Sequence, residues 1–204
     1  GSFSIELTGL NPETEYFVTA YAVNKKGITY GNQISFTTGC GNETFTDPRD
    51  GHVYKTVRIG DQIWMAENVA FDPGLGSWCY ENDPSNCETN GNLYNYDAAL
   101  LAVPPGWHMP TRDEFEILLS NFETGSDAYD GLREVGCEAF GSLFSGFVNI
   151  DGSFVYQGQY TDYWSSTPEA SGWVYVLDLN TVSLEATVAP DRKVRGFSLR
   201  CVKN

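Results

Sequence analysis

The clearest helix signal in this chain lies near its middle, between two regions in which strand signals dominate. Thr111 and Glu114 stand three residues apart and form a capping box, in which each side chain accepts from a free N–H group at the start of the helix. The apolar residues that follow at helical spacing are Phe115, Leu118, Leu119 and Phe122. Gly125 is expected to end this helix, and beyond it the apolar residues alternate with a period of two. The order of strands, helices and strands predicts an α+β domain.

The segments on either side of this helix carry weaker local signals. Residues 52–59 and 62–65 alternate as strands around a Gly60-Asp61 turn, whereas residues 72–92 are rich in turn-forming residues and are expected to be loops. A second short helix is predicted over Gly91–Ala102, with Leu93, Tyr96, Leu100 and Leu101 on one side. The later strands are expected at 143–149 and 153–158, as a hairpin, and at 173–179 and 194–202.

The charge of the chain limits its partners. The 204 residues include 12 Lys and Arg against 27 Asp and Glu, which gives a net charge of −15. Such a surface repels phosphate backbones and anionic lipid headgroups, so we expect no nucleic-acid partner. No apolar run approaches the roughly 18 residues that a membrane span needs, so we also expect no membrane insertion of this fragment. We interpret the acidic surface as a means of keeping the protein soluble, which is a simpler explanation than a role in excluding acidic ligands or binding cations.

The first 39 residues form a separate segment, which we expect to end at Gly39-Cys40-Gly41. Three short strand signals occur between Phe3 and Thr38, with turns at Asn11-Pro12 and Lys26-Gly27. The run from Leu7 to Tyr16, LTGLNPETEY, resembles the fibronectin type III pattern, and Tyr16 stands where that family has its tyrosine corner. The resemblance covers only part of such a domain. It implies a partial β-sandwich segment that acts as a spacer.

Residues 40–204 resemble a second family, the Fibrobacter succinogenes major paralogous domain family. The matching segments occur in the family's order, and they are residues 45–60, Trp64–Asn68 (WMAEN), Trp78–Tyr80 (WCY), Gly106–Thr111 (GWHMPT), Tyr163–Thr167 (YWSST) and Gly196–Val202 (GFSLRCV). The resemblance implies a C-type-lectin-like fold with two short helices and twisted antiparallel sheets. It also implies an extracellular protein of the bacterial cell surface, lipid-anchored through an N-terminal part that precedes Gly1. The activity of this family is largely undefined, so the resemblance gives the fold and the location better than the chemistry.

The five cysteines favour disulfides in an oxidising compartment, because none of them forms a CxxC pair. Cys79 and Cys87 flank a turn-rich loop and are expected to pair with each other. The resemblance to the lectin-like fold, in which the chain ends meet, favours a bond between Cys40 and Cys201. In that case Cys137 is a buried thiol. A bond between Cys137 and Cys201, and a free Cys201, remain the alternatives.

The residue types that carry catalysis are present, but they are not arranged in a recognisable motif. The sequence contains no P-loop, GxSxG or HExxH pattern, and no paired ligands at zinc spacing. Trp64, Trp107 and Trp164 are expected in the core, and His108 is expected to make a structural hydrogen bond. The sugar-binding triplets of calcium-dependent lectins are absent as well. We therefore expect no enzyme, no cofactor and no metal.

The remaining hypothesis is a binding or adhesion module for glycan or protein at the cell surface. In lectin-like folds the loops and strands between the WSS-type motif and the last strand often present the binding face, and this region corresponds here to residues 163–195. The exposed candidates in this region are Trp173, Tyr175, Asp178, Asn180, Glu185, Asp191 and Arg192. Two alternatives stay open: Trp173 and Tyr175 belong to the core of a strand, or the whole domain is a structural display or filament-tip part without a small-ligand site.

Overall fold

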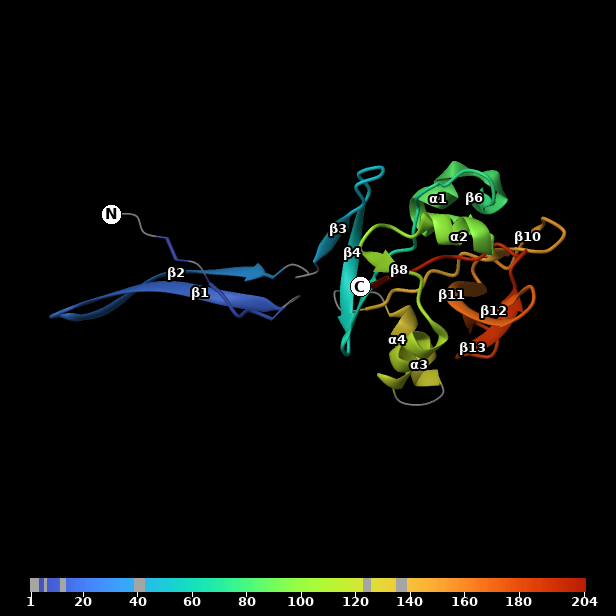
Figure 1. Ribbon diagram of the computed structural model, residues 1–204. Coiled ribbons are helices and arrows are strands. Elements are labelled where there is room, and N and C mark those ends of the chain that lie inside the picture. Colours follow the sequence, from blue (N-terminus) through green and yellow to red (C-terminus); the bar gives the residue numbers. More distant parts are fainter. Residues whose placement is uncertain (1–3, 6, 12–13, 39–42, 123–125, 135–138) are drawn as a thin grey trace. The chain divides into compact units, whose positions relative to one another are not determined.

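The computed structural model describes residues 4–5, 7–11, 14–38, 43–122, 126–134 and 139–204 (Figure 1). The chain divides into two compact units, Gly1–Gly41 and Asn42–Asn204. Among the described residues, none of the helices combines the length and the apolar character needed to cross a membrane.

The first unit is a β-hairpin. Strand β1 (Glu15–Asn24) pairs antiparallel with β2 (Gly27–Thr37), and a bulge interrupts the register between Thr19 and Tyr21. Three strands were expected here, but the described residues before β1 contain no strand. The Tyr16 hydroxyl accepts a hydrogen bond from the Asn11 amide at 2.8 Å, which ties the segment before β1 back to the strand.

The second unit is built on a five-stranded sheet that gathers strands from both ends of the unit. Its order is β3 (Thr44–Thr46), β4 (Val53–Ile59), β5 (Gln62–Met65), β14 (Val202–Lys203) and β8 (Trp107–His108). The alternation in β4 buries Tyr54 and exposes its neighbours, as the period of two predicted. Most of the strand expected at residues 194–202 is instead irregular chain, and only its last residue belongs to β14.

A second sheet consists of three long consecutive antiparallel strands, β11 (Tyr160–Ala170), β12 (Trp173–Asn180) and β13 (Glu185–Arg192). Only β12 was predicted from the sequence. Alternating side chains of this sheet enter two different cores. Trp164 and Val176 belong to the core that also contains helix α2 (Tyr96–Ala102), whereas Tyr163 and Leu177 belong to the core under helices α3 (Arg112–Ser120) and α4 (Ser126–Arg133).

Two short ladders complete the strands. β6 (Ser77–Trp78) pairs with β7 (Leu93–Tyr94), and β9 (Phe147–Val148) pairs with β10 (Phe154–Val155). The β9–β10 pair is the hairpin expected around Asp151-Gly152, although its strands are much shorter than predicted. In Figure 1 α3 and α4 lie side by side near β13, with which both helices are in contact.

Helix α3 has the predicted start. The Thr111 hydroxyl accepts from the Glu114 amide, and the Glu114 carboxylate accepts from the Thr111 amide, so the capping box is complete. The helix buries Phe115 and Leu118. It ends at Ser120 with Asn121 as its cap, whereas the predicted end, Gly125, lies outside the described residues.

The prediction of two helices was wrong, because the described residues contain four. Residues 72–92, expected to be loops, include a 3-10 turn (η1, Tyr80–Asn82) and helix α1 (Pro84–Asn90), which starts because Asp83 accepts from the Ser85 amide while Pro84 fixes the first turn. The region beyond Gly125, expected to be strands, contains α4, which buries Tyr129 and Leu132.

Helix α2 also differs from its prediction. It starts at Tyr96 rather than Gly91, since Asn95 caps it, and Leu93 belongs to strand β7. Leu100 and Leu101 are exposed, at 47% and 67%. The residues that face the core are Tyr96, Ala98, Ala99 and Ala102. Small alanines let the helix approach the core closely, and such a face lacks the large apolar residues that mark most buried helix faces.

Candidate binding site

A buried arginine organises the centre of the second unit. Arg200 is fully buried and donates from Nε to Asn68 Oδ1 at 2.7 Å, from Nη2 to the Gly141 carbonyl at 2.7 Å, and from Nη1 to the Phe140 carbonyl. Within the described part of the chain, no carboxylate forms an ion pair with it. Burial lowers the pKa of Arg200 from its ordinary value. The guanidinium is therefore held by oxygen dipoles rather than by an opposite charge.

Asn68 is the second member of this network. Its amide nitrogen donates to the Asn90 carbonyl at 2.8 Å, and more weakly to the hydroxyls of Ser145 and Ser198. These contacts join the end of β5, the end of α1, the 139–145 segment and the last strand region. Two of the segments that carry the family resemblance, WMAEN and GFSLRCV, thus meet at the Asn68–Arg200 contact.

A cavity of about 300 Å³ lies over this network. We call it the Asn68 pocket. Asn68, Ala66 and Gly141 belong to its lining, and the carbonyl of Gly141 is one of the acceptors of Arg200. The other lining residues come from the start of β4 and the residue before it, the segment after β5, α1 and its C-terminal cap, and the 139–143 segment: His52, Lys55, Glu67, Ala70, Cys87, Glu88, Thr89, Gly91, Ala139 and Leu143.

The polar groups of the pocket have both signs of charge. The Lys55 ammonium lies 3.8 Å from the Glu67 carboxylate, which also accepts from the Lys55 amide at 2.9 Å. Both side chains are substantially exposed, so this ion pair contributes little to stability. The pocket therefore offers an ammonium, carboxylates, a hydroxyl and a ring nitrogen beside small apolar side chains.

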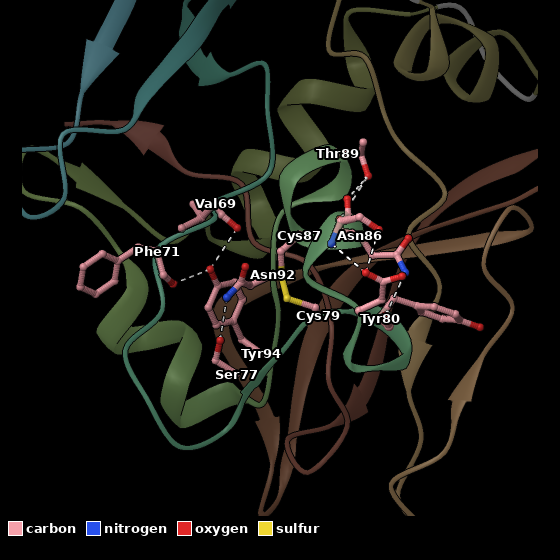
Figure 2. Close-up of a disulfide and its surroundings, with 12 residues drawn as sticks. Val69, Phe71, Ser77, Cys79, Tyr80, Asn86, Cys87, Thr89, Asn92 and Tyr94 are labelled. Carbon is pink, nitrogen blue, oxygen red and sulfur yellow. Dashed lines mark hydrogen bonds between the residues drawn. A yellow bond between two sulfur atoms is a disulfide. The ribbon is translucent and has the colours of Figure 1, made fainter.

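The α1 side of the pocket is braced by a disulfide. Cys79 and Cys87 are bonded, as the sequence predicted (Figure 2). Asn86, next to Cys87, donates to the Tyr80 carbonyl at 3.0 Å, and Thr89 bonds back within α1 to the Ser85 carbonyl. Figure 2 also shows Tyr94, whose hydroxyl lies between the carbonyls of Val69 and Phe71 at 3.0 and 2.8 Å. The segment after β5 and helix α1, which both line the pocket, are thus fixed by covalent and hydrogen bonds.

The residues that the sequence suggested for ligand binding lie on β12 and β13, away from the lining of this pocket. They fall on the two faces of the sheet. Trp173 faces Arg192 across the ladder, and Tyr175 lies two residues further along the same face. The others, by the same alternation and register, lie on the opposite face: Asp178, Asn180, Glu185 and Asp191.

The first face carries two arginine–aromatic pairs. The Arg192 guanidinium lies 5.0 Å from the Trp173 ring centre, and the Arg112 guanidinium of α3 lies 4.7 Å from the Tyr175 ring centre. Trp173 and Tyr175 are half-buried, so they are neither core residues nor fully free. Arg112, which the sequence did not indicate as a site residue, also pairs with Glu116 at 2.7 Å.

The opposite face carries a carboxyl pair. Asp162 faces Asp178 directly across β11 and β12 and donates a hydrogen bond to it. Burial of Asp162, followed by the nearby Asp178 and Asp191 carboxylates, raises its pKa well above the usual range. Asp191 pairs with Arg195 at 2.8 Å. In the described ranges, no three histidine, cysteine or acidic side chains are arranged to hold a metal ion.

The cysteine near the C-terminus differs from the pairing that the lectin-like fold suggested. Cys201 is a free thiol, fully buried, and burial raises its pKa. The pairing of Cys40 with Cys201 is therefore wrong. Cys40 and Cys137 lie outside the described residues. A buried neutral thiol of this kind is a poor nucleophile.

The tryptophans and His108 have structural environments. Trp64 and Trp164 are fully buried and Trp107 is 6% exposed. The Trp164 indole donates to the Tyr94 carbonyl at 2.7 Å. His108 contacts Glu114 at 2.7 Å through Nε2 and Asn204 at 2.8 Å through Nδ1, so both ring nitrogens are engaged.

These features define a mixed α+β domain that is braced by a disulfide and has a polar pocket over a buried arginine. The Fibrobacter succinogenes major domain family matches residues 57–203, and the chain belongs to this family. The matched region includes Asn68 and Arg200 and most of the pocket lining. No curated protein and no solved structure was found to match the chain.

Proposed function

We propose that this chain is an extracellular binding module that holds a glycan residue in the Asn68 pocket. The observation that carries the proposal is the contrast between the floor of the pocket and its walls. Asn68 and Arg200 have their hydrogen bonds within the protein, whereas the side chains of Lys55, Glu67 and Thr89 reach a cavity of about 300 Å³. Such a site is preorganised and pays little ordering cost on binding.

The size and the lining suit a sugar. Ligand pockets have volumes of roughly 300 Å³ or more and a few placed polar groups. A sugar residue presents several hydroxyl groups, each of which donates and accepts, together with apolar C–H groups. Lys55 donates, Glu67 accepts, and Ala66 and Ala70 offer apolar contact. A purely apolar ligand would leave these charges desolvated and unpaired.

Holding rather than reacting is part of the proposal. The Glu67 carboxylate already accepts from the Lys55 amide, and Cys87 is committed to its disulfide. The reduced Cys201 is buried with a raised pKa, and it does not belong to the pocket lining. The His52 ring packs at 4.4 Å from the Tyr54 ring, a contact that fixes its position.

The location and the finer fold assignment belong to the same proposal. The Cys79–Cys87 bond is compatible with an oxidising compartment such as the cell exterior. The hydrogen bond from the Asn11 amide to the Tyr16 hydroxyl supports a fibronectin-type hairpin, since that contact has the tyrosine-corner pattern. Pairing of β14 with β5 supports the lectin-like scheme, in which the two ends of the domain meet. The lipid anchor remains a prediction from the family resemblance.

A glycan array probed at low and at millimolar calcium tests the function. We expect binding to at least one saccharide, and loss of that binding in Thr89→Trp, which fills the mouth of the pocket from an exposed position on α1. Lys203→Ala, an exposed change on β14, is the matched control and should bind as the wild type does. Binding to no saccharide at either calcium level would overturn the proposal and favour a display module. If binding of an uncharged saccharide survives Thr89→Trp, the Asn68 pocket is not the site that holds it.

A further inference from the structure

The outer end of the β12–β13 ladder carries a basic aromatic surface in an acidic protein. Trp173 and Arg192 face each other across the ladder, and Tyr175 follows Trp173 on the same face. Two residues of a strand span about 6.6 Å, so the two rings are neighbours. Arg112 of α3 lies over the second ring. We call these four side chains the arginine–aromatic face.

The two arginines differ in their partners. Arg112 pairs with Glu116, which satisfies much of its charge. Arg192 is exposed, and no carboxylate of the described chain forms an ion pair with it. Its guanidinium lies 5.0 Å from the Trp173 ring centre. A stacked guanidinium uses its flat face for the ring and keeps the N–H groups in its own plane for an anion.

We propose that the arginine–aromatic face binds a carboxylate-bearing polysaccharide, with Arg192 as the contact to the carboxylate. Trp173 holds the guanidinium in one orientation, and this lowers the ordering cost of a bidentate contact. Tyr175 supplies an adjacent ring edge for the C–H groups of the sugar. The net charge of −15 repels polyanions at long range, so an acidic ligand binds only where the local charge is reversed.

A polysaccharide fits this face better than an acidic peptide does. Extended peptides commonly bind by adding a strand, which requires free main-chain groups at a sheet edge. Strand β12 is paired on both sides, with β11 and with β13, so the main-chain groups beneath Trp173 and Tyr175 are already used. Strand β13, which carries Arg192, is the edge of this sheet, and binding of poly-glutamate tests whether a peptide adds there. What the face offers is rings and guanidinium groups, which suit the C–H face and the carboxylate of a uronate residue.

This site shares no residue with the Asn68 pocket, so the two proposals fail separately. The probe is polygalacturonate, and fully methyl-esterified polygalacturonate, which has the same backbone without the charge, is the neutral comparison. We expect the chain to bind the charged polymer, to bind it more weakly as NaCl rises from about 50 to about 500 mM, and to ignore the ester.

The variants decide between a placed arginine and general charge. Arg192→Gln should weaken binding about tenfold or more, because a charge-assisted bidentate contact is lost. Arg192→Lys should fail to restore it, since an ammonium is not bidentate. Lys203→Gln removes the same charge from an exposed position elsewhere and should change binding little. Thr89→Trp, which blocks the pocket, should leave binding to polygalacturonate intact.

Three results would overturn this inference. The first is equal binding of Arg192→Gln and Lys203→Gln, which would mean that no specific contact exists. The second is equal binding of the neutral ester, and the third is equal or tighter binding of poly-glutamate, which would point to an acidic protein partner. A wild-type thermal midpoint for Arg192→Gln shows that any loss comes from the contact and not from unfolding.

Discussion

Arg200 and Asn68 lie 132 positions apart in the sequence and are joined by one hydrogen bond of 2.7 Å, from the guanidinium Nε to the amide oxygen. Around this bond the end of α1, the 139–145 segment and the last strand region converge. The pocket that we propose as the binding site depends on this contact. The segments that meet here are not neighbours in one long sheet. A buried polar network therefore joins them in place of the hydrogen bonds between paired strands.

Arg200→Met should destabilise the chain. The substitution leaves Asn68 Oδ1 and the carbonyls of Phe140 and Gly141 without their donor, and an unpaired buried polar group costs about 1–3 kcal/mol. Removing a charge that is expensive to bury offsets part of this cost, so we expect a net loss of about 3 kcal/mol in the free energy of unfolding, measured by urea denaturation. Wild-type stability would show that the network is not needed to hold the floor of the pocket.

The Cys79–Cys87 bond should matter for both stability and binding. Closing a loop of this length contributes about 2.5 kcal/mol in the chain-entropy view, so the double variant Cys79→Ser/Cys87→Ser should lose roughly that amount. Since Cys87 lines the pocket, the variant should also lose glycan affinity under conditions where it is still folded. If affinity were unchanged in the folded variant, the disulfide would have no part in shaping the site.

The Asp162–Asp178 pair should make stability depend on pH. The pKa of Asp162 is raised in the folded protein, so the folded state holds its proton more tightly than the unfolded chain does. The stabilising effect is complete below the unfolded pKa of about 4 and is lost as pH rises toward the folded pKa, at about 1.4 kcal/mol for each pH unit.

Asp162→Asn keeps a donor for Asp178 but cannot ionise. Thermal midpoints measured from pH 4 to pH 9 should therefore fall less steeply in this variant than in the wild type. The charges of Asp191 and Arg195 also act on the pair. Both residues are present in the wild type and in the variant, so their effects on stability cancel in the comparison. Parallel curves would rule out the shared proton.

The hydrogen bond between Asn11 and Tyr16 should be visible in hydrogen exchange. Tyr16→Phe removes the acceptor of the Asn11 amide and keeps the ring, which stacks on Phe36. We expect faster exchange at Asn11 and a local loss of about 1 kcal/mol, with exchange in the second unit unchanged. Unchanged exchange at Asn11 would show that the contact is not formed in solution.

The predictions that succeeded rested on local signals. The capping box of α3 and the Cys79–Cys87 bond involve residues close in sequence, and β4 begins with the predicted alternation, which breaks only where Thr56 and Val57 are both buried. Helix α1 was missed because PSNCETN has the composition of a loop, and its start depends on the Asp83 cap. The buried face of α2 was misassigned because it is made of alanines.

The site was harder to predict for a topological reason. Lys55, Asn68, Thr89 and Gly141 come together from four separate segments, and no spacing along the chain marks them as neighbours. The suggested residues on β12 and β13 were close in sequence. Because strand β13 was not recognised, the register that pairs Arg192 with Trp173 and puts Asp191 on the opposite face could not be predicted.

The most direct test of the account is a titration of isotope-labelled protein with an uncharged saccharide selected on the array, followed by amide chemical shifts. We predict that the largest changes occur at Lys55, Glu67, Thr89 and Gly141, and that Thr89→Trp abolishes them. Changes centred on β12 and β13 with these four amides silent, or saturable binding that Thr89→Trp leaves intact, would contradict the claim that the Asn68 pocket is where this domain holds its ligand.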